Sequence, residues 1–177
     1  MNKSQQFRQS VLNQIEQACQ QVKRDPSTVQ LLAVSKTHPS QTLREMYTVG
    51  QRCFGENYLQ EALTKIDDLQ ELDIEWHFIG HVQRNKTKHL AETFDWVHGV
   101  DRFIIAERLS KQRLENQKPL NICIQVNIDG QNSKDGCQPN EVLELVHQIS
   151  QLPNIRLRGL MVIPAPDHPQ AFQDAKQ

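Results

Sequence analysis

Residues 31–39 have the sequence LLAVSKTHP, in which a short apolar run is followed by polar residues and a proline. A four-residue apolar run with such boundaries is typical of a buried strand, so we expect a strand over residues 31–34. Residues 35–39 are then the loop that leaves this strand. Lys36 therefore stands at a strand exit, which is where parallel α/β barrels collect their functional side chains.

The amine of Lys36 has two interpretations at this position. A lysine beside a buried strand is partly desolvated, and desolvation favours the neutral amine. A neutral amine is a nucleophile that forms Schiff bases with aldehydes and ketones, as do the lysines that hold pyridoxal phosphate and those of class I aldolases. The alternative is a solvated loop lysine, and the position in the fold leaves both interpretations open.

Composition limits the classes of partner. The chain has 177 residues and a formal net charge of −1, which suits one domain with a sizeable core and provides no basic field for nucleic acid or an anionic membrane. The basic cluster at residues 84–88 lacks aromatic residues for base stacking. No apolar run could span a bilayer, and the N-terminus lacks a signal peptide. We therefore expect a cytoplasmic protein with no nucleic-acid or membrane partner, whose four cysteines are reduced thiols.

Strand-like and helix-like segments alternate along the chain. We expect strands over residues 31–34, 53–54, 76–79, 96–100, 120–128 and 156–162. We expect a first helix over residues 4–23 and a second that begins with Ser40 as its N-cap and ends at Gly50. Further helices are expected from residue 59 and near residues 85, 104 and 142. Such alternation implies a parallel sheet with right-handed crossovers. The predicted fold class is α/β, a partial (β/α)8 TIM-type barrel preceded by an N-terminal helix. A closed barrel takes about 250 residues, so about six of the eight βα units are present.

Three other kinds of site are not supported by the sequence. His77 and His81 lie four residues apart on a predicted strand, and Phe78 stands where a metalloprotease motif has glutamate. Lys134 stands where a calcium loop requires glycine. The seven glycines form no phosphate-binding loop. We therefore expect no metal site, and a phosphorylated ligand would need a cradle of another kind.

Five motifs follow one another along the chain: LLAVSKT (31–37), FGENYLQE (54–61), WHFIG with QRNK (76–80 and 83–86), NSKDG (132–136) and RGLMVIP (158–164). In order and spacing they resemble the motifs of the pyridoxal phosphate homeostasis proteins, a family related to the N-terminal barrel of alanine racemase. The resemblance covers nearly the whole chain, and five motifs in order are far more specific than one.

This resemblance implies a single barrel domain over residues 1–177 in which Lys36 carries pyridoxal 5'-phosphate as an internal aldimine. It implies that Asn57, His77 and Met161 are further cofactor-binding residues, and that there are no catalytic residues. The implied role is the intracellular homeostasis of vitamin B6 and amino acids without turnover. Free amino acids and pyridoxal-phosphate-dependent enzymes are the further partners that such a role implies.

The chain departs from the family pattern at three places. His81 and Val82 replace a Pro-Leu pair, Asp135 and Cys137 are smaller changes in a loop, and the family's C-terminal segments with the phosphate cradle do not follow Gln177. We expect a domain that lacks its C-terminal portion, self-associates through open strand edges and loses the cofactor on dialysis. The two alternative interpretations are a pyridoxal-phosphate-dependent, amino-acid-racemase-like enzyme and a non-functional fragment.

Overall fold

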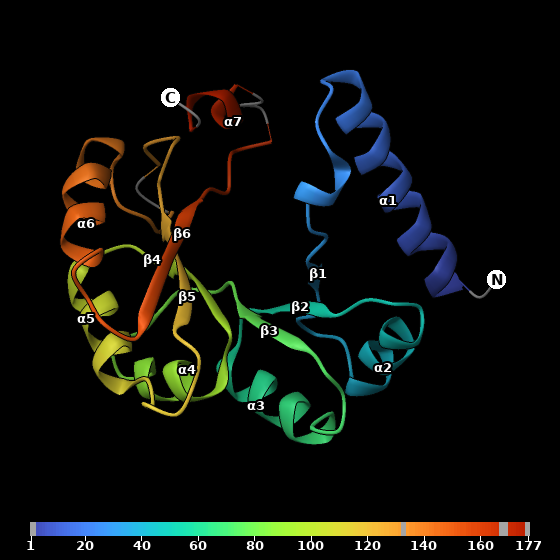
Figure 1. Ribbon diagram of the computed structural model, residues 1–177, viewed down its shortest axis with the longest axis horizontal. Helices are drawn as coiled ribbons and strands as arrows, with labels where there is room; N and C mark the ends of the chain where they lie inside the picture. Colours follow the sequence, from blue (N-terminus) through green and yellow to red (C-terminus); the bar gives the residue numbers. More distant parts are fainter. Residues whose placement is uncertain (1–2, 132–133, 167–169, 176–177) are drawn as a thin grey trace. The chain divides into compact units, whose positions relative to one another are not determined.

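The computed structural model describes residues 3–131, 134–166 and 170–175 (Figure 1). The chain forms two compact units, one of Met1–Gly55 with Gln60–Glu75 and the other of Glu56–Leu59 with Trp76–Gln177. Six parallel strands in the order β1-β2-β3-β4-β5-β6 alternate with helices along the chain. The alternation confirms the predicted α/β class.

The first unit contains the N-terminal helix and the first two strands. Its elements are α1 (Lys3–Gln21), a 3-10 helix η1 (Pro26–Thr28), β1 (Ala33–Val34), α2 (Ser40–Thr48), β2 (Cys53–Glu56) and α3 (Leu59–Asp68). β1 pairs with β2 in parallel, with Ala33 opposite Phe54 and Val34 opposite Gly55. The predicted strand at residues 31–34 is thus confirmed in its second half, but it is not the buried strand that was expected, because Ala33 is half-buried and Val34 is 52% exposed.

Two expectations for the first unit were wrong in detail. Ser40 is the first residue of α2 and not its side-chain cap, because its hydroxyl donates to Asp68 Oδ2 at 2.6 Å. The helix predicted over residues 4–23 ends at Gln21 as α1, and it packs little of its surface: Cys19 is buried, whereas Phe7 is 62% exposed. Gly50 does follow the end of α2, with a positive φ of 92° that favours glycine.

The second unit contains the longer strands. Its elements are β3 (Glu75–Phe78), α4 (Thr87–Thr93), β4 (Trp96–Val100), α5 (Phe103–Gln112), β5 (Leu120–Gln125), η2 (Pro139–Glu141), α6 (Val142–Ile149), β6 (Ile155–Met161) and α7 (Ala171–Asp174). The register places His77 opposite Trp96, Val97 opposite Ile122, and Gln125 opposite Met161. Helices α4, α5 and α6 lie along one side of β4 and β5 (Figure 1).

The core of the second unit lies between these strands and helices. Side chains that alternate along β5 point into it, as the period of two in a strand requires, whereas Val97 and Val100 of β4 are three residues apart because the register shifts between them. The members with no exposed surface are Val97, Val100, Leu120, Ile122 and Ile124 from the strands, and Leu90, Ala91, Ile105, Ala106 and Leu109 from the helices. The four cysteines are free and buried.

β5 ends three residues earlier than its alternating sequence predicts. Its ladder stops at Gln125, and the following backbone groups bond to the loop that returns toward η2: Asn127 N donates to Cys137 O, and Cys137 N donates to Gln125 O, each at 2.9 Å. Gly136 permits this return, since its φ is 123° and a Cβ there would lie 2.6 Å from Asn127 N. A period-two pattern cannot show where such a loop replaces the neighbouring strand.

Candidate functional site

Lys36 lies where the sequence places it, two residues after the end of β1. The residue before it, Ser35, is buried and donates its backbone N–H to Gly55 O at 2.9 Å. The Ser35 hydroxyl lies 3.3 Å from the same carbonyl oxygen. These bonds continue the pairing of β1 with β2 up to the residue that precedes Lys36, while Lys36 itself is half-buried.

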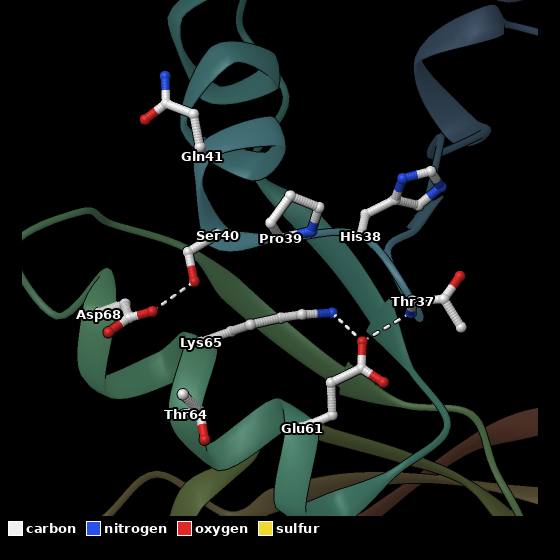
Figure 2. Close-up of a pocket in the computed structure, with 9 residues that line it drawn as sticks. All are labelled: Thr37, His38, Pro39, Ser40, Gln41, Glu61, Thr64, Lys65 and Asp68. Carbon is white, nitrogen blue, oxygen red and sulfur yellow. Dashed lines mark hydrogen bonds and ion pairs between the residues drawn. The ribbon is translucent and has the colours of Figure 1, made fainter.

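A charged pair on α3 holds the backbone on both sides of Lys36. Lys65 Nζ donates to Ser35 O at 2.7 Å and to Glu61 Oε1 at 2.5 Å. Glu61 Oε1 also accepts the backbone N–H of Thr37 at 2.6 Å. Figure 2 shows the Lys65 side chain extended toward Glu61, with the Thr37 amide on the other side of the carboxylate. One carboxylate and one ammonium therefore bind the two residues that flank Lys36.

The electrostatics of this pair favour its ionised form. The hydrogen bond from Lys65 is the main reason why the pKa of Glu61 is lowered below its usual value, and the amide of Thr37 adds to it. The Lys65 side chain is only 5% exposed, whereas that of Glu61 is 30% exposed. Glu61 is therefore a carboxylate at neutral pH, and it supplies the negative charge that a buried ammonium requires.

Lys65 is the functional residue that the sequence analysis missed. On α3 the buried positions are Leu59, Ala62 and Lys65, so the lysine occupies the helix face that packs inward. A lysine at a core-facing helix position, four residues after a glutamate, is a signal that the sequence contains. Its partner at Ser35 lies thirty residues away and could not be inferred from this spacing.

An open depression of about 630 Å³ lies beside this pair (Figure 2). Its lining comes from residues 37–41, which include the start of α2, and from α3, with Thr64 and Asp68 beyond the charged pair. Lys36 is not part of this lining. The depression therefore lies between α2 and α3, next to the charged pair that binds the Lys36 loop, and Lys36 does not face it.

Asn57 directly follows β2 and belongs to the second unit. Its side-chain oxygen Oδ1 is buried and has no hydrogen-bond partner among the described residues. Gly80, two residues after β3, packs on the backbone of Asn57, because a Cβ at Gly80 would lie 2.4 Å from Asn57 O. A buried acceptor without a partner is costly, so Asn57 Oδ1 is suited to receive a donor from a ligand or from water.

His77 lies on β3 within a wall of rings on the second unit's sheet. His77 Nδ1 is 2.9 Å from His98 Nε2, and the His77 ring stacks on Trp96 with centroids 5.3 Å apart. The Arg158 guanidinium lies over the Trp96 ring at 5.4 Å. Burial, with a smaller contribution from the nearby His77, lowers the pKa of His98 to about 4, so His98 is neutral at pH 7.

Met161 is the last residue of β6, and its carbonyl accepts the backbone N–H of Val126 at 2.9 Å. Close to this strand end, Lys134 Nζ binds Asp129 Oδ2 at 2.5 Å and Ile163 O at 2.9 Å. The loop motif 132–136 thus ties the exit of β5 to the exit of β6, although Asn132 and Ser133 lie outside the described residues.

The predicted site residues accordingly fall at strand ends or on strands, and they are divided between the two units. Asn57, His77 and Met161 all belong to the second unit, where β4 and β5 separate the strand of His77 from that of Met161. Lys36 belongs to the first unit. The assignment of these four residues to a cofactor therefore remains a prediction.

Comparison with known families gives a clear result. The profile of the alanine racemase N-terminal domain matches residues 10–177. A relative from Pseudomonas aeruginosa, named pyridoxal phosphate homeostasis protein, is 54% identical over 165 residues, which are 93% of this chain and 72% of the relative. The chain belongs to the pyridoxal phosphate homeostasis protein family. A member from Escherichia coli K12 is 48% identical over 172 residues, covering 94% of this chain and 74% of its own length.

Solved structures agree with this family assignment. PipY from Synechococcus elongatus, solved with pyridoxal phosphate bound, is 38% identical with a TM-score of 0.74, covering 92% of this chain and 76% of its own. An alanine racemase from Clostridium difficile has a TM-score of 0.68 at 11% identity, over 84% of this chain and 40% of the racemase. The second likeness shows that the family shares the fold of the racemase barrel domain. Within the part that the structure describes, no helix is long and apolar enough to cross a bilayer.

Proposed function

We propose that the chain binds pyridoxal 5'-phosphate through a Schiff base at Lys36 and takes part in the homeostasis of vitamin B6 and amino acids in the cytoplasm, without turnover. The observation that carries the proposal is the Lys36 amine at the exit of β1, in a chain whose relatives are named for this cofactor. The bound form of PipY supports the choice of cofactor.

The residues of the Lys36 loop suit this cofactor as a covalent anchor. When bound, pyridoxal phosphate supplies an aldehyde carbon that a lysine amine can attack. Lys36 is half-buried, and its ammonium makes no ion pair or hydrogen bond among the described residues. The flanking backbone is bound by Lys65 at Ser35 and by Glu61 at Thr37. An amine that is not engaged elsewhere, on a fixed backbone, is what such an attachment needs.

The second unit contains the other candidate cofactor-binding residues. Asn57 Oδ1 is a buried acceptor, and the His77 ring stacks on Trp96. Met161 lies at a strand end. We propose these three as cofactor-binding residues, with free amino acids and pyridoxal-phosphate-dependent enzymes as the partners that receive or compete for the cofactor.

Borohydride reduction of the loaded protein, followed by peptide mass mapping, tests the anchor. We expect the pyridoxyl group on Lys36 and its loss from that peptide in Lys36→Arg, which keeps the charge but cannot form a Schiff base. A label on another lysine such as Lys134, with Lys36 unmodified in the wild type, would refute the assignment.

Deuterium exchange tests the absence of turnover. A racemase-like enzyme must remove the α-proton of its amino acid with a positioned base. We expect exchange of the α-proton for solvent deuterium no faster than with free pyridoxal phosphate. Exchange well above that rate, and dependent on Lys36, would favour the racemase-like alternative.

A further inference from the structure

We infer that Glu61 and Lys65 are positioning residues that hold the Lys36 amine in the geometry for Schiff-base formation, an inference that rests on the proposed function. Both side chains come from α3, and they bind the backbone of the two residues next to Lys36. They act on Lys36 through the chain and need not touch the cofactor.

The direction of a side chain is set by its own backbone, and here the backbone is bound on each side. Lys65 Nζ donates to the carbonyl oxygen of Ser35 at 2.7 Å, and Glu61 Oε1 accepts the N–H of Thr37 at 2.6 Å. The N–H of Ser35 is already used by Gly55 O. The Cα–Cβ direction of Lys36 is therefore fixed by α3 and β2 together, while its four-carbon stem remains free to reach a carbonyl carbon.

Thr37 gives a second reason to assign a positioning role. Its φ is +64°, a left-handed value that is uncommon for residues with a branched Cβ. Such a conformation persists when surrounding bonds maintain it. The bond from the Thr37 N–H to Glu61 is of this kind, so losing the carboxylate would allow the peptide after Lys36 to rotate.

The charge of Lys65 is not needed to fill space. The position of Lys65, which follows Leu59 and Ala62 on the buried face of α3, would accept an unbranched apolar side chain of similar length. Replacing a buried ion pair by apolar residues is often neutral or stabilising, so a buried pair is weak support for stability. Apolar side chains could not provide the hydrogen bonds that the pair makes, from Lys65 to the Ser35 carbonyl and from the Thr37 N–H to Glu61. These bonds act on the Lys36 loop.

Binding titrations of pyridoxal phosphate, followed by Schiff-base absorbance, test the inference on the full chain. The variants are Lys65→Met, Glu61→Leu and Glu61→Gln. We expect Lys65→Met and Glu61→Leu to weaken Schiff-base formation at least about tenfold. Glu61→Gln should fall between them and the wild type, because its amide oxygen can still accept the Thr37 N–H.

Arg44→Met is the matched control in the same unit. Arg44 pairs with Glu71 and donates to Asp68 O at 3.1 Å, so it joins α2 to the end of α3 without contacting residues 35–37. We expect Arg44→Met to bind pyridoxal phosphate like the wild type. Equal weakening by Arg44→Met and Lys65→Met would overturn the inference, since the effect would then be one of general stability.

The same titrations separate this inference from the proposed function. If the wild type carries the label on Lys36 and Lys65→Met binds equally well, the positioning role is refuted and the proposed function stands. If the wild type forms no Schiff base at Lys36, the proposed function fails first. Should Lys65→Met fail to fold, the comparison of Glu61→Leu with Glu61→Gln decides: equal binding by both and by the wild type refutes the role of the Thr37 bond.

Discussion

The first unit holds its strand exit with an ion pair, whereas the second unit supports its sheet face with stacked aromatic rings. Around Lys36 the supporting atoms are the ammonium of Lys65 and the carboxylate of Glu61. On β3 and β4 they are two imidazoles and an indole, with His98 kept neutral by burial. Charge provides strong, directed bonds to backbone groups, and stacked rings provide a broad contact surface along the sheet.

The two arrangements differ in the pH range over which acid weakens them. His98 has a folded pKa of about 4 against an ordinary 6.5, so the unfolded chain binds more protons between these values and stability falls as pH drops through this range. Glu61 has a lowered folded pKa, so its contribution is complete above its ordinary value of 4.5 and is lost as pH falls through the folded pKa. The loss in the second unit therefore begins at higher pH.

The largest effect should come from breaking the charged pair. Lys65→Met leaves the Glu61 carboxylate and the carbonyl of Ser35 without their ammonium partner. Removing one member of a buried pair costs about 3–5 kcal/mol, and we expect a decrease in the free energy of unfolding toward the lower end because Glu61 is part-exposed. Urea denaturation measures it.

Lys111→Met is the control for this variant. Lys111 pairs with Glu107 on α5 in the same i,i+4 spacing class, but its side chain is 68% exposed. An exposed pair of this kind contributes less than about 1 kcal/mol. Similar losses in the two variants would contradict the assigned importance of burial at Lys65.

Acidification should produce a smaller loss that comes from the second unit. Between pH 7 and pH 4 we expect the neutral His98 to account for up to about 3 kcal/mol of lost stability. His98→Gln should flatten the stability profile between pH 6.5 and 4, whereas His89→Gln, at an exposed position on α4, should leave it unchanged. Stability curves at several pH values test both. An unaltered slope in His98→Gln would exclude this histidine as the source.

The smallest of the three effects concerns the packing of Gly80 on Asn57. Gly80→Ala would place a Cβ 2.4 Å from a backbone oxygen, and relief of such a contact costs about 1–3 kcal/mol. Gly130→Ala is the control, because Gly130 has a positive φ of 64° and open space around it. We expect the thermal midpoint to fall further for Gly80→Ala than for Gly130→Ala. The reverse order would show that backbone strain, not close approach, dominates at these turns.

The sequence predicted the elements better than their ends. The strand over residues 96–100 and the helix from residue 59 are where the apolar periodicities place them, because periodicity reports which face of an element is buried. The boundary errors have a local cause in each case. The Ser40 hydroxyl donates to Asp68 and does not cap its own helix. β5 ends before its predicted last residues because Asn127 bonds to Cys137 in the loop. The two partners, Asp68 and Cys137, lie too far along the chain for a local sequence pattern to include them.

The site residues divide in the same way. The sequence alone determined that Lys36 stands at a strand exit, since an apolar run and the polar residues after it are local features, and its motifs determined the family. Only the tertiary structure decided what surrounds it. The bond of Lys65 to Ser35 spans thirty residues and the pairing of His77 with His98 spans twenty-one. Such contacts arise when parallel strands and their crossover helices pack together, and residue spacing along the chain does not encode which side chains then meet.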